Sequence, residues 1–454
     1  MQEQTNEPGA QPVASLTHPV AEALAADEHV RVRALVQDLP TPDLADLIGM
    51  LEPGQRVRLI EALGPNFRPE VLPELEAGVL EQLLPALPRD VLASAIAALE
   101  TDDAAYLLSG LDEPARQEIL GRIPTVDRAA LERNLKYPEE TAGRLMQTDF
   151  VAVPPFWSVG QVIDHMREVE DLPETFSDIF VVDPTHRVLG SVDLSRLLRT
   201  KRQVGIAAIM DASRHVVLAT EDQEKVARQF ERYDLRSAPV VDADKRLVGV
   251  VTVDDVVDVI EEEAEEDLLR MGGVGDESVG DSVAETVRNR FLWLFINLGT
   301  ALVSASVIKL FDATISQMVA LAVLMPIVAS MGGNAATQTM TVTVRALATR
   351  ELGAVNAVRV ILREASVGLI NGLVFAAIMG LVVLFWFGIG KLGIVIATAM
   401  VCNFLAAALA GILIPLGLTR AGFDPAVASG VFVTTVTDVV GFFAFLGLAT
   451  LWLI

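Results

Sequence analysis

The chain has 454 residues, with 60 Asp or Glu against 35 Lys or Arg, which gives a net charge of −25. The acidity lies in the first 290 residues, which hold 55 acids and 28 bases, whereas residues 291–454 hold five acids and seven bases. Such an acidic half excludes nucleic acid as a partner, because phosphates would be repelled, and it suits a domain that collects cations.

The beginning of the chain, MQEQTNEPGAQPVAS at residues 1–15, predicts a disordered tail. It lacks the basic segment and apolar core of a signal peptide, so we expect the N-terminal half to stay in the cytoplasm. The single cysteine, Cys402, excludes a disulfide within one chain.

A twelve-residue repeat follows in residues 16–137. Eight aliphatic residues recur at this spacing, each followed directly by Pro, Gly, Asp or Glu, with short helical patterns such as DVLASAIAAL between them. The pattern predicts a stack of short helices, an α-helical solenoid-like N domain with an interaction or spacer role. The repeated residues are Leu39, Leu51, Leu63, Leu75, Leu87, Leu99, Leu111 and Ile123.

Residues 138–263 change to a mixed α/β pattern that occurs twice. IFVVDPTHRVLGSVDLSRLL at 179–198 and APVVDADKRLVGVVTVDDVV at 238–257 share a Val-Asp pair and a glycine at an offset of 59 residues. Each copy reads helix, strand, Asp-containing turn, Gly, strand, helix, which resembles a cystathionine-β-synthase (CBS) domain. The resemblance implies an α/β tandem CBS pair, 138–201 and 202–263, of a kind that is regulatory more often than catalytic.

The end of the second copy carries nine acids in the 14 residues 254–267. This run predicts an acidic connecting helix, residues 264–288, that loosens at the glycines after Arg270. A solvated helix face is the common meaning of a charge run. Like charges one turn apart destabilise a helix, however, and few Lys or Arg lie nearby, so we expect the run to need counter-charge from elsewhere.

Five uncharged stretches follow, each long enough to span, or nearly span, ~30 Å of hydrocarbon at ~20 residues. They predict a five-helix all-α transmembrane pore domain at residues 289–454 in a lipid bilayer. Seven arginines near one set of helix ends against two lysines near the other place the N-terminus inside and the C-terminus outside. The stretches are 291–308, 313–344, 365–390, 392–419 and 425–437, the last continuing past Asp438 to 454.

Asp438 is the only charged side chain between Pro425 and Ile454. A charge at mid-bilayer costs at least ~3 kcal/mol, so it persists mainly where it faces water, an ion or a partner. The neighbouring hydroxyls of Thr434, Thr435 and Thr437 make an all-oxygen environment, which a hard cation prefers. The alternative is an aspartate that hydrogen-bonds between helices and only holds them together.

The second uncharged stretch contains PIVASMGGNAATQ at 326–338. Pro326 interrupts the helical hydrogen bonds and Gly332-Gly333 permit an unwound or a tightly packed turn. Together with VASGVFVTTVTDVVG at 427–441, this segment resembles the MgtE family of magnesium channels along nearly the whole chain. Ala336 and Val431 stand where that family usually has Gly and Pro, which affects local backbone geometry and leaves the carboxylate intact.

The resemblance implies a homodimer in which Asp438 of each subunit holds a hydrated Mg²⁺ in the pore. The path would be lined near Gly430, Thr434, Thr435, Thr437 and Asn334. The resemblance further implies cytosolic Mg²⁺ sites on the acidic half and the loop before the last helix. The matching positions are Asp102, Asp103, Asp222, Glu224, Asp234, Asp255, Asp258, Glu263, Glu266, Asp267 and Asp424.

The sequence thus predicts a Mg²⁺ channel for uptake across the cytoplasmic membrane, closed by cytosolic Mg²⁺; ATP binding at the CBS pair stays open. The alternative is a secondary divalent-cation exchanger on the same fold, with Glu364 as the only other acid able to approach the membrane interior. A structural CBS sensor without a pore leaves Asp438 unexplained. An enzyme is disfavoured, because the chain has no His after 215, no phosphate-binding loop motif and no base near Cys402.

Overall fold

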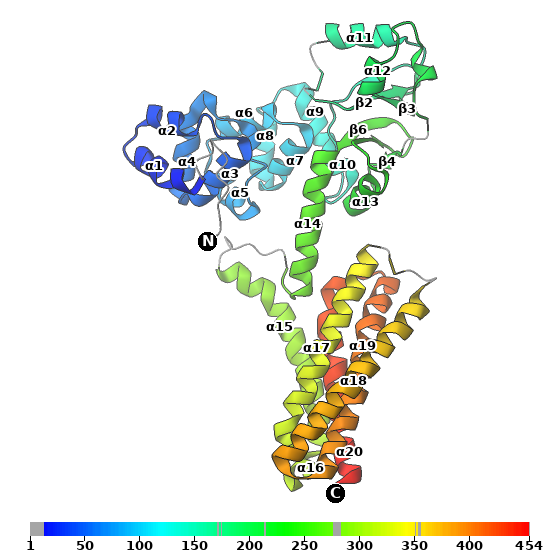
Figure 1. Ribbon diagram of the computed structural model, residues 1–454. Helices are drawn as coiled ribbons and strands as arrows, with labels where there is room; N and C mark the ends of the chain where they lie inside the picture. Colours follow the sequence, from blue (N-terminus) through cyan, green and yellow to red (C-terminus); the bar gives the residue numbers. More distant parts are fainter. Residues whose placement is uncertain are drawn as a thin grey trace, which may run out of the picture. The chain divides into compact units, whose positions relative to one another are not determined.

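The computed structural model describes residues 13–454 with the exception of 170–171, 174, 213–214, 276–282, 350, 353–355 and 454. The chain divides into two compact units, and the boundary falls after Glu263, inside helix α14 (Val253–Met271). The first unit holds the strands and most of the short helices, and the second holds the long apolar helices (Figure 1).

The N-terminal part of the first unit is built from short helices. The first of them begins at Val13, inside the segment predicted as a tail; residues 1–12 of that tail lie outside the described residues. The helices are α1 (Val13–Ala25), α2 (His29–Val36), α3 (Thr41–Met50), α4 (Pro53–Leu63), α5 (Ala77–Leu83), α6 (Arg89–Ala98), α7 (Thr101–Ser109), α8 (Glu113–Leu120) and α9 (Thr125–Asn134), with 3₁₀ turns η1 (Gly64–Asn66), η2 (Pro69–Val71) and η3 (Leu84–Ala86).

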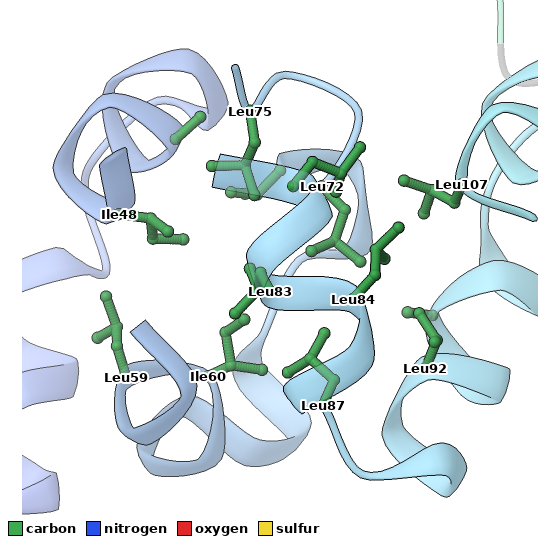
Figure 2. Close-up of a cluster of buried hydrophobic side chains, with 14 of the residues drawn as sticks. Ile48, Leu59, Ile60, Leu72, Leu75, Leu83, Leu84, Leu87, Leu92 and Leu107 are labelled. Carbon is green, nitrogen blue, oxygen red and sulfur yellow. The ribbon is translucent and has the colours of Figure 1, made fainter. Parts of the chain in front are cut away.

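The twelve-residue repeat marks helix starts. In most repeats the residue after the aliphatic one is the N-cap, such as Pro88 before α6 and Asp112 before α8. The aliphatic residue therefore occupies the position before the cap, where an apolar side chain packs under the first turn and fixes the entry of the chain. Figure 2 shows Leu75 and Leu87, two of the repeat residues, in the buried cluster between these helices. The predicted solenoid-like stack is confirmed.

The second part of the first unit contains two small sheets of the same topology. In each, a short first strand pairs parallel with the second, which pairs antiparallel with the third. The predicted order of helix, strand, turn, strand and helix is confirmed in both copies, and a short strand precedes each of them. The elements are α10 (Ala142–Leu145), β1 (Ala152–Val153), α11 (Val159–Glu168), β2 (Asp178–Val182), β3 (Val188–Asp193), α12 (Leu194–Leu198), η4 (Ile206–Ala208), β4 (Val217–Leu218), α13 (Gln223–Tyr233), β5 (Ser237–Val241), β6 (Leu247–Thr252) and α14.

The 59-residue offset corresponds to a structural symmetry. Asp183 and Asp242 each accept two backbone N–H groups of their own turn, at 2.7–2.9 Å, and so hold the two hairpins in the same shape. Asp178 and Ser237, which are equivalent residues of β2 and β5, are hydrogen-bonded to each other at 2.6 Å. The two copies therefore meet through matching strands.

The second unit is all-helical, and five of its described helices are long and apolar enough to cross a membrane. Figure 1 shows α17 to α20 packed side by side. Helix α19 is the most buried of the five and α15 the least. The elements are α15 (Val283–Leu310), α16 (Asp312–Gln317), α17 (Ala320–Ala348), α18 (Ala357–Phe387), α19 (Gly390–Ala421) and α20 (Pro425–Trp452).

Helix α17 differs from one expectation. It runs without interruption through Pro326 and through Gly332-Gly333, so the unwound turn is not formed. Only helices satisfy their own backbone groups in hydrocarbon, which favours keeping the helix even across these residues. The tightly packed alternative holds for Gly332, which is buried against Asn403 of α19, whereas Gly333 has open space where a side chain would lie.

Candidate ion path and cation-binding sites

Asp438 lies in the middle of α20, 13 residues after Pro425, and its side chain is partly buried. At 1.5 Å per residue this places it about 20 Å from the start of the helix, near the centre of a bilayer. A second acid, Asp424, caps the start of the helix, and its carboxylate accepts the N–H of Ala426 at 2.8 Å. One helix therefore positions both acids, at its end and at its centre.

The three threonines beside Asp438 use their hydroxyl protons within α20. Thr434 donates to the Gly430 carbonyl at 2.9 Å, Thr435 to Val431 at 2.6 Å and Thr437 to Thr434 at 2.9 Å. Their oxygens keep free lone pairs and can face a cation or its water. Thr434 and Thr435 are partly exposed, whereas Thr437 is completely buried within the unit.

Helix α17 presents a polar stripe in the middle of its span. Asn334, Thr337, Gln338 and Thr341 are all exposed and recur at the spacing of one helix face. Thr337 and Thr341 donate to carbonyls of their own helix, at 3.0 and 2.9 Å. Polar groups at this depth are costly against lipid, so the stripe suits contact with water or with another protein surface.

An acidic cluster joins the short helices to the second CBS copy in the first unit. Asp102 and Asp103 lie in the first turn of α7, and Asp255 and Asp258 lie in the first turns of α14. Asp102 is only 9% exposed, and its buried Oδ1 has no hydrogen-bond partner among the described residues. We call this group, with Glu74 and Glu100, the interdomain acidic cluster.

Burial raises the pKa of most carboxyls in this cluster. The pKa of Asp103 rises to about 7, through burial first and then the charges of Asp255, Glu100, Glu74 and Asp258. Burial likewise raises the pKa of Asp255 to about 6, against a lowering hydrogen bond from Thr252, and raises the pKa of Asp102 well above its ordinary range. A divalent cation would relieve both the repulsion and the desolvation, and its binding would release protons.

Sequence reasoning missed Glu74 and Glu100 as members of this cluster. Glu100 caps α7 two residues before Asp102, and an acid at such a cap is a signal that sequence can supply. Glu74 lies next to the repeat residue Leu75, and nothing in the sequence pairs it with α14.

The raised pKa values predict a pH dependence of stability without divalent cations. The folded pKa values of Asp103 and Asp255 exceed their ordinary 3.8, so the folded protein binds more protons between about pH 4 and 7. The free energy of unfolding therefore falls as pH rises through this window, and below about pH 4 the contribution no longer changes. We expect the first unit in chelator to melt about 5 °C lower at pH 8 than at pH 5.5.

The measurement is the Tm of wild type and of Asp103→Asn at both pH values, with and without Mg²⁺. Asp103→Asn should reduce the difference, and Asp43→Asn, which changes an acid on α3 outside the cluster, should not. An equal pH effect in Asp103→Asn and wild type would contradict the assignment.

A second group of acids surrounds the middle of α14. Glu263 accepts a hydrogen bond from the Gln223 side chain at 3.0 Å. Burial raises the pKa of Glu263, and the charges of Glu224, Glu140 and Asp222 add to the shift. Asp222 also caps α13, and Glu224 pairs with Arg228. The predicted residues Asp222, Glu224 and Glu263 are thus neighbours, and Glu140 is an addition.

The third group lies in the second unit, where α14 ends. Arg270 forms ion pairs with Glu266, one turn before it, and with Asp424, 2.9 Å away at the start of α20. The counter-charge that the acidic run needs is therefore supplied partly by its own Arg270. Asp267 lies between Glu266 and Arg270 in the sequence of α14. Asp234 follows the end of α13 in a left-handed conformation; it is exposed and belongs to none of the three groups.

These groups suit a hydrated cation better than a dehydrated one. Among the described residues, no three His, Cys, Asp or Glu side chains converge as ligands of one metal ion. Mg²⁺ commonly keeps several waters and uses one or two carboxylates per site. Two places fit such binding: Asp102 Oδ1, which has no hydrogen-bond partner among the described residues and lies beside Asp255, and the group around Glu263. Residues 276–282 are outside the part of the chain that the structure describes.

Family models match three parts of the chain. The MgtE intracellular N domain matches residues 39–140, the CBS domain matches 142–202 and 206–262, and the MgtE divalent cation transporter domain matches 325–448. Together these matches follow the order of parts seen in the fold.

Similar proteins agree with the models. A magnesium transporter MgtE of Thermus thermophilus is 37% identical over 330 residues, 72% of this chain and 73% of the relative. One of Bacillus subtilis is 31% identical over 332 residues, 73% of this chain and 74% of the relative.

Two solved structures resemble the first unit, each with a TM-score of 0.50. The soluble part of a magnesium transporter is 27% identical, covering 56% of this chain and 99% of that one. The cytosolic domain of the Mg²⁺ channel MgtE in complex with ATP is 32% identical, covering 54% and 99%. On the domain models and these relatives, the chain belongs to the MgtE family, a family of membrane-embedded magnesium transporters.

Proposed function

We propose that this protein is a Mg²⁺-selective channel that mediates magnesium uptake across the cytoplasmic membrane and is closed by cytosolic Mg²⁺. The observation that carries the proposal is Asp438, a partly buried carboxylate at the centre of an apolar helix with hydroxyl oxygens beside it. Outer-shell binding of a hydrated ion by this carboxylate costs little dehydration and lets the ion leave again.

A homodimer completes the path. The exposed stripe of Asn334, Thr337 and Gln338 on α17 is unfavourable against lipid and becomes favourable against water lined by a second copy. Two subunits would bring two Asp438 carboxylates to one path. Cross-linking of cysteines placed at 334 and 338 in a chain whose Cys402 is replaced tests this arrangement.

Gating follows from the acids along α14. Each of the three groups includes residues of α14: Asp255 and Asp258 in the interdomain acidic cluster, then Glu263, and then Glu266 with Arg270. Cations at these sites neutralise repulsion and favour one arrangement of the cytosolic parts. Each ion shifts the equilibrium only by its differential affinity, so several weak sites act together.

The arginines near one set of helix ends support a membrane orientation in which those ends face the cytoplasm. The N-terminus is then in the cytoplasm and the C-terminus outside. A nucleotide site at the CBS pair is supported by the similar cytosolic domain that was solved with ATP. Calorimetric titration of ATP into the full-length protein, with and without Mg²⁺, tests that part.

An exchanger on the same fold would need a second intramembrane carboxylate for its coupling ion. Glu364, the remaining candidate, lies seven residues after the start of α18 and directly after Arg363, near a helix end. The position favours an interfacial role, so a channel is the better reading. Single-channel conductance separates the two mechanisms.

The test of the function is Mg²⁺ flux into liposomes that contain the purified protein. We expect rapid flux that falls when Mg²⁺ is raised on the face carrying the cytosolic unit. Flux that saturates at the turnover of a carrier and requires a counter-ion gradient would contradict a channel.

Arg270 gives a further prediction about gating. Its guanidinium forms ion pairs with Glu266 and Asp424, so its positive charge neutralises part of the charge of these two carboxylates. Arg270→Gln should leave that site more negative and lower the half-inhibitory Mg²⁺ concentration by about fivefold, the equivalent of ~1 kcal/mol for a partly exposed pair. Arg228→Gln, which frees only Glu224, is the matched control. A higher half-inhibitory concentration in Arg270→Gln would show instead that the ion pair itself holds the closed state.

A further inference from the structure

Asn403 is a completely buried carboxamide inside α19, the most buried of the apolar helices. Its side-chain N–H donates to the Val328 carbonyl of α17 at 2.8 Å. Its Oδ1 is buried and has no hydrogen-bond partner among the described residues. A polar side chain at this depth is costly, so its retention calls for a specific role.

Glycines of two other helices make the room for this side chain. A Cβ at Gly441 of α20 would lie 2.8 Å from Asn403 Nδ2 and 3.2 Å from Oδ1, and a Cβ at Gly332 of α17 would overlap Nδ2 outright. Side chains of a helix tilt toward its N-terminus, so a side chain at 332 would also cover the Val328 carbonyl that Asn403 uses. The Asn403 carboxamide therefore packs against a glycine of α17 and a glycine of α20.

The two glycines lie beside the elements of the ion path. Gly441 follows Asp438 by three residues, which makes them neighbours on the surface of α20. Gly332 precedes Asn334 by two, so α17 can pack with Gly332 inward and Asn334 exposed. The contacts of Asn403 thus fix how closely the helix of the polar stripe and the helix of the carboxylate approach α19.

We propose that Asn403 is a positioning residue for ion conduction, which holds α17 and α20 at the separation that places Asp438 and the polar stripe along one path. The inference rests on the proposed pore role of Asp438. The proposed role differs from filling space between the helices, because an apolar side chain could fill the same space without a hydrogen bond to Val328.

The experiment measures Mg²⁺ flux of the full-length protein in liposomes as a function of Mg²⁺, which yields the maximal flux and the half-saturating concentration. Asn403→Leu keeps the number and branching of the side-chain heavy atoms, with bulkier methyl groups, and removes the amide. We expect its maximal flux to fall at least about tenfold and its Mg²⁺ over Ca²⁺ preference to change, with an unchanged elution profile in detergent. Wild-type flux and preference in Asn403→Leu would overturn the proposal.

Compensation supplies the second, independent arm. Gly332→Ala and Gly441→Ala should each lower flux in the wild-type chain, and neither should lower it further in the Asn403→Ala chain, where the clashing amide is gone. Gly411→Ala is the matched control on α19, because its Cβ would meet the Ala336 carbonyl at 2.9 Å and the Met340 nitrogen at 3.1 Å. Shortening Asn403 cannot relieve those contacts. Gly411→Ala should therefore lower flux in both chains. A further loss from Gly332→Ala and Gly441→Ala in the Asn403→Ala chain, or no loss there from Gly411→Ala, would overturn the proposal.

Asp438→Asn separates this inference from the function on which it rests. A conducting Asp438→Asn would remove the proposed pore role itself. A silent Asp438→Asn together with fully active Asn403 variants would reject the positioning role alone.

Discussion

Replacing Asp438 by Asn is expected to abolish Mg²⁺ conduction while the protein stays folded. The amide keeps the shape of the side chain and loses its charge, so the hydrated ion loses charge-assisted hydrogen bonds worth ~1.5–3 kcal/mol each. A loss of ~3 kcal/mol corresponds to a flux about 100-fold lower. Flux into liposomes is the measurement, with the gel-filtration profile in detergent as the test of folding.

Two variants make the result specific to the position. Asp438→Glu keeps the charge on a longer side chain and should retain partial flux with altered selectivity. Asp312→Asn removes an acid at the start of α16, outside the long apolar helices, and should conduct as wild type does. Wild-type flux in Asp438→Asn would reject the pore role and favour an aspartate that only holds helices together.

Removing residues 1–263 is expected to leave a channel that no longer closes when Mg²⁺ is raised on the cytosolic face. This cut follows the boundary between the two units, so the shortened chain keeps Arg270 and its ion pair with Asp424. It removes the interdomain acidic cluster and Glu263 together with the acids around it. Flux should then vary less than about twofold over Mg²⁺ concentrations that reduce the flux of the full chain at least tenfold, since the closing free energy comes from the cations bound to these groups.

The comparison is made at constant ionic strength, with Na⁺ replacing Mg²⁺. A full-length variant with Asp102, Asp103 and Asp255 replaced by Asn is the intermediate case, and it should retain part of the inhibition through the group around Glu263. Undiminished inhibition of the shortened chain would place the sensor within residues 264–454.

Many elements of this protein, and its membrane carboxylate, could be predicted from the sequence because their signals are local. A lone charge in an apolar run marks Asp438 from composition alone, since no partner is needed to see how unfavourable it is. The twelve-residue repeat predicted a stack of short helices, because the apolar residue before a cap and the cap itself are adjacent in sequence. The 59-residue offset of Asp183 and Asp242 predicted two copies of one sheet, because each turn is held by its own aspartate.

The tertiary structure alone decided which residues meet. Arg270 pairs with Asp424 across 154 positions, and Asn403 bonds Val328 across 75, separations at which periodicity carries no information. The same holds for Glu74, which reaches Asp258 only through packing, and for α17, which stays helical because hydrocarbon offers no other partner for its backbone. Local elements are determined by neighbours in sequence, whereas sites that combine several elements depend on long-range packing. The sequence could therefore name the candidate acids, but it could not say which of them lie together in one site.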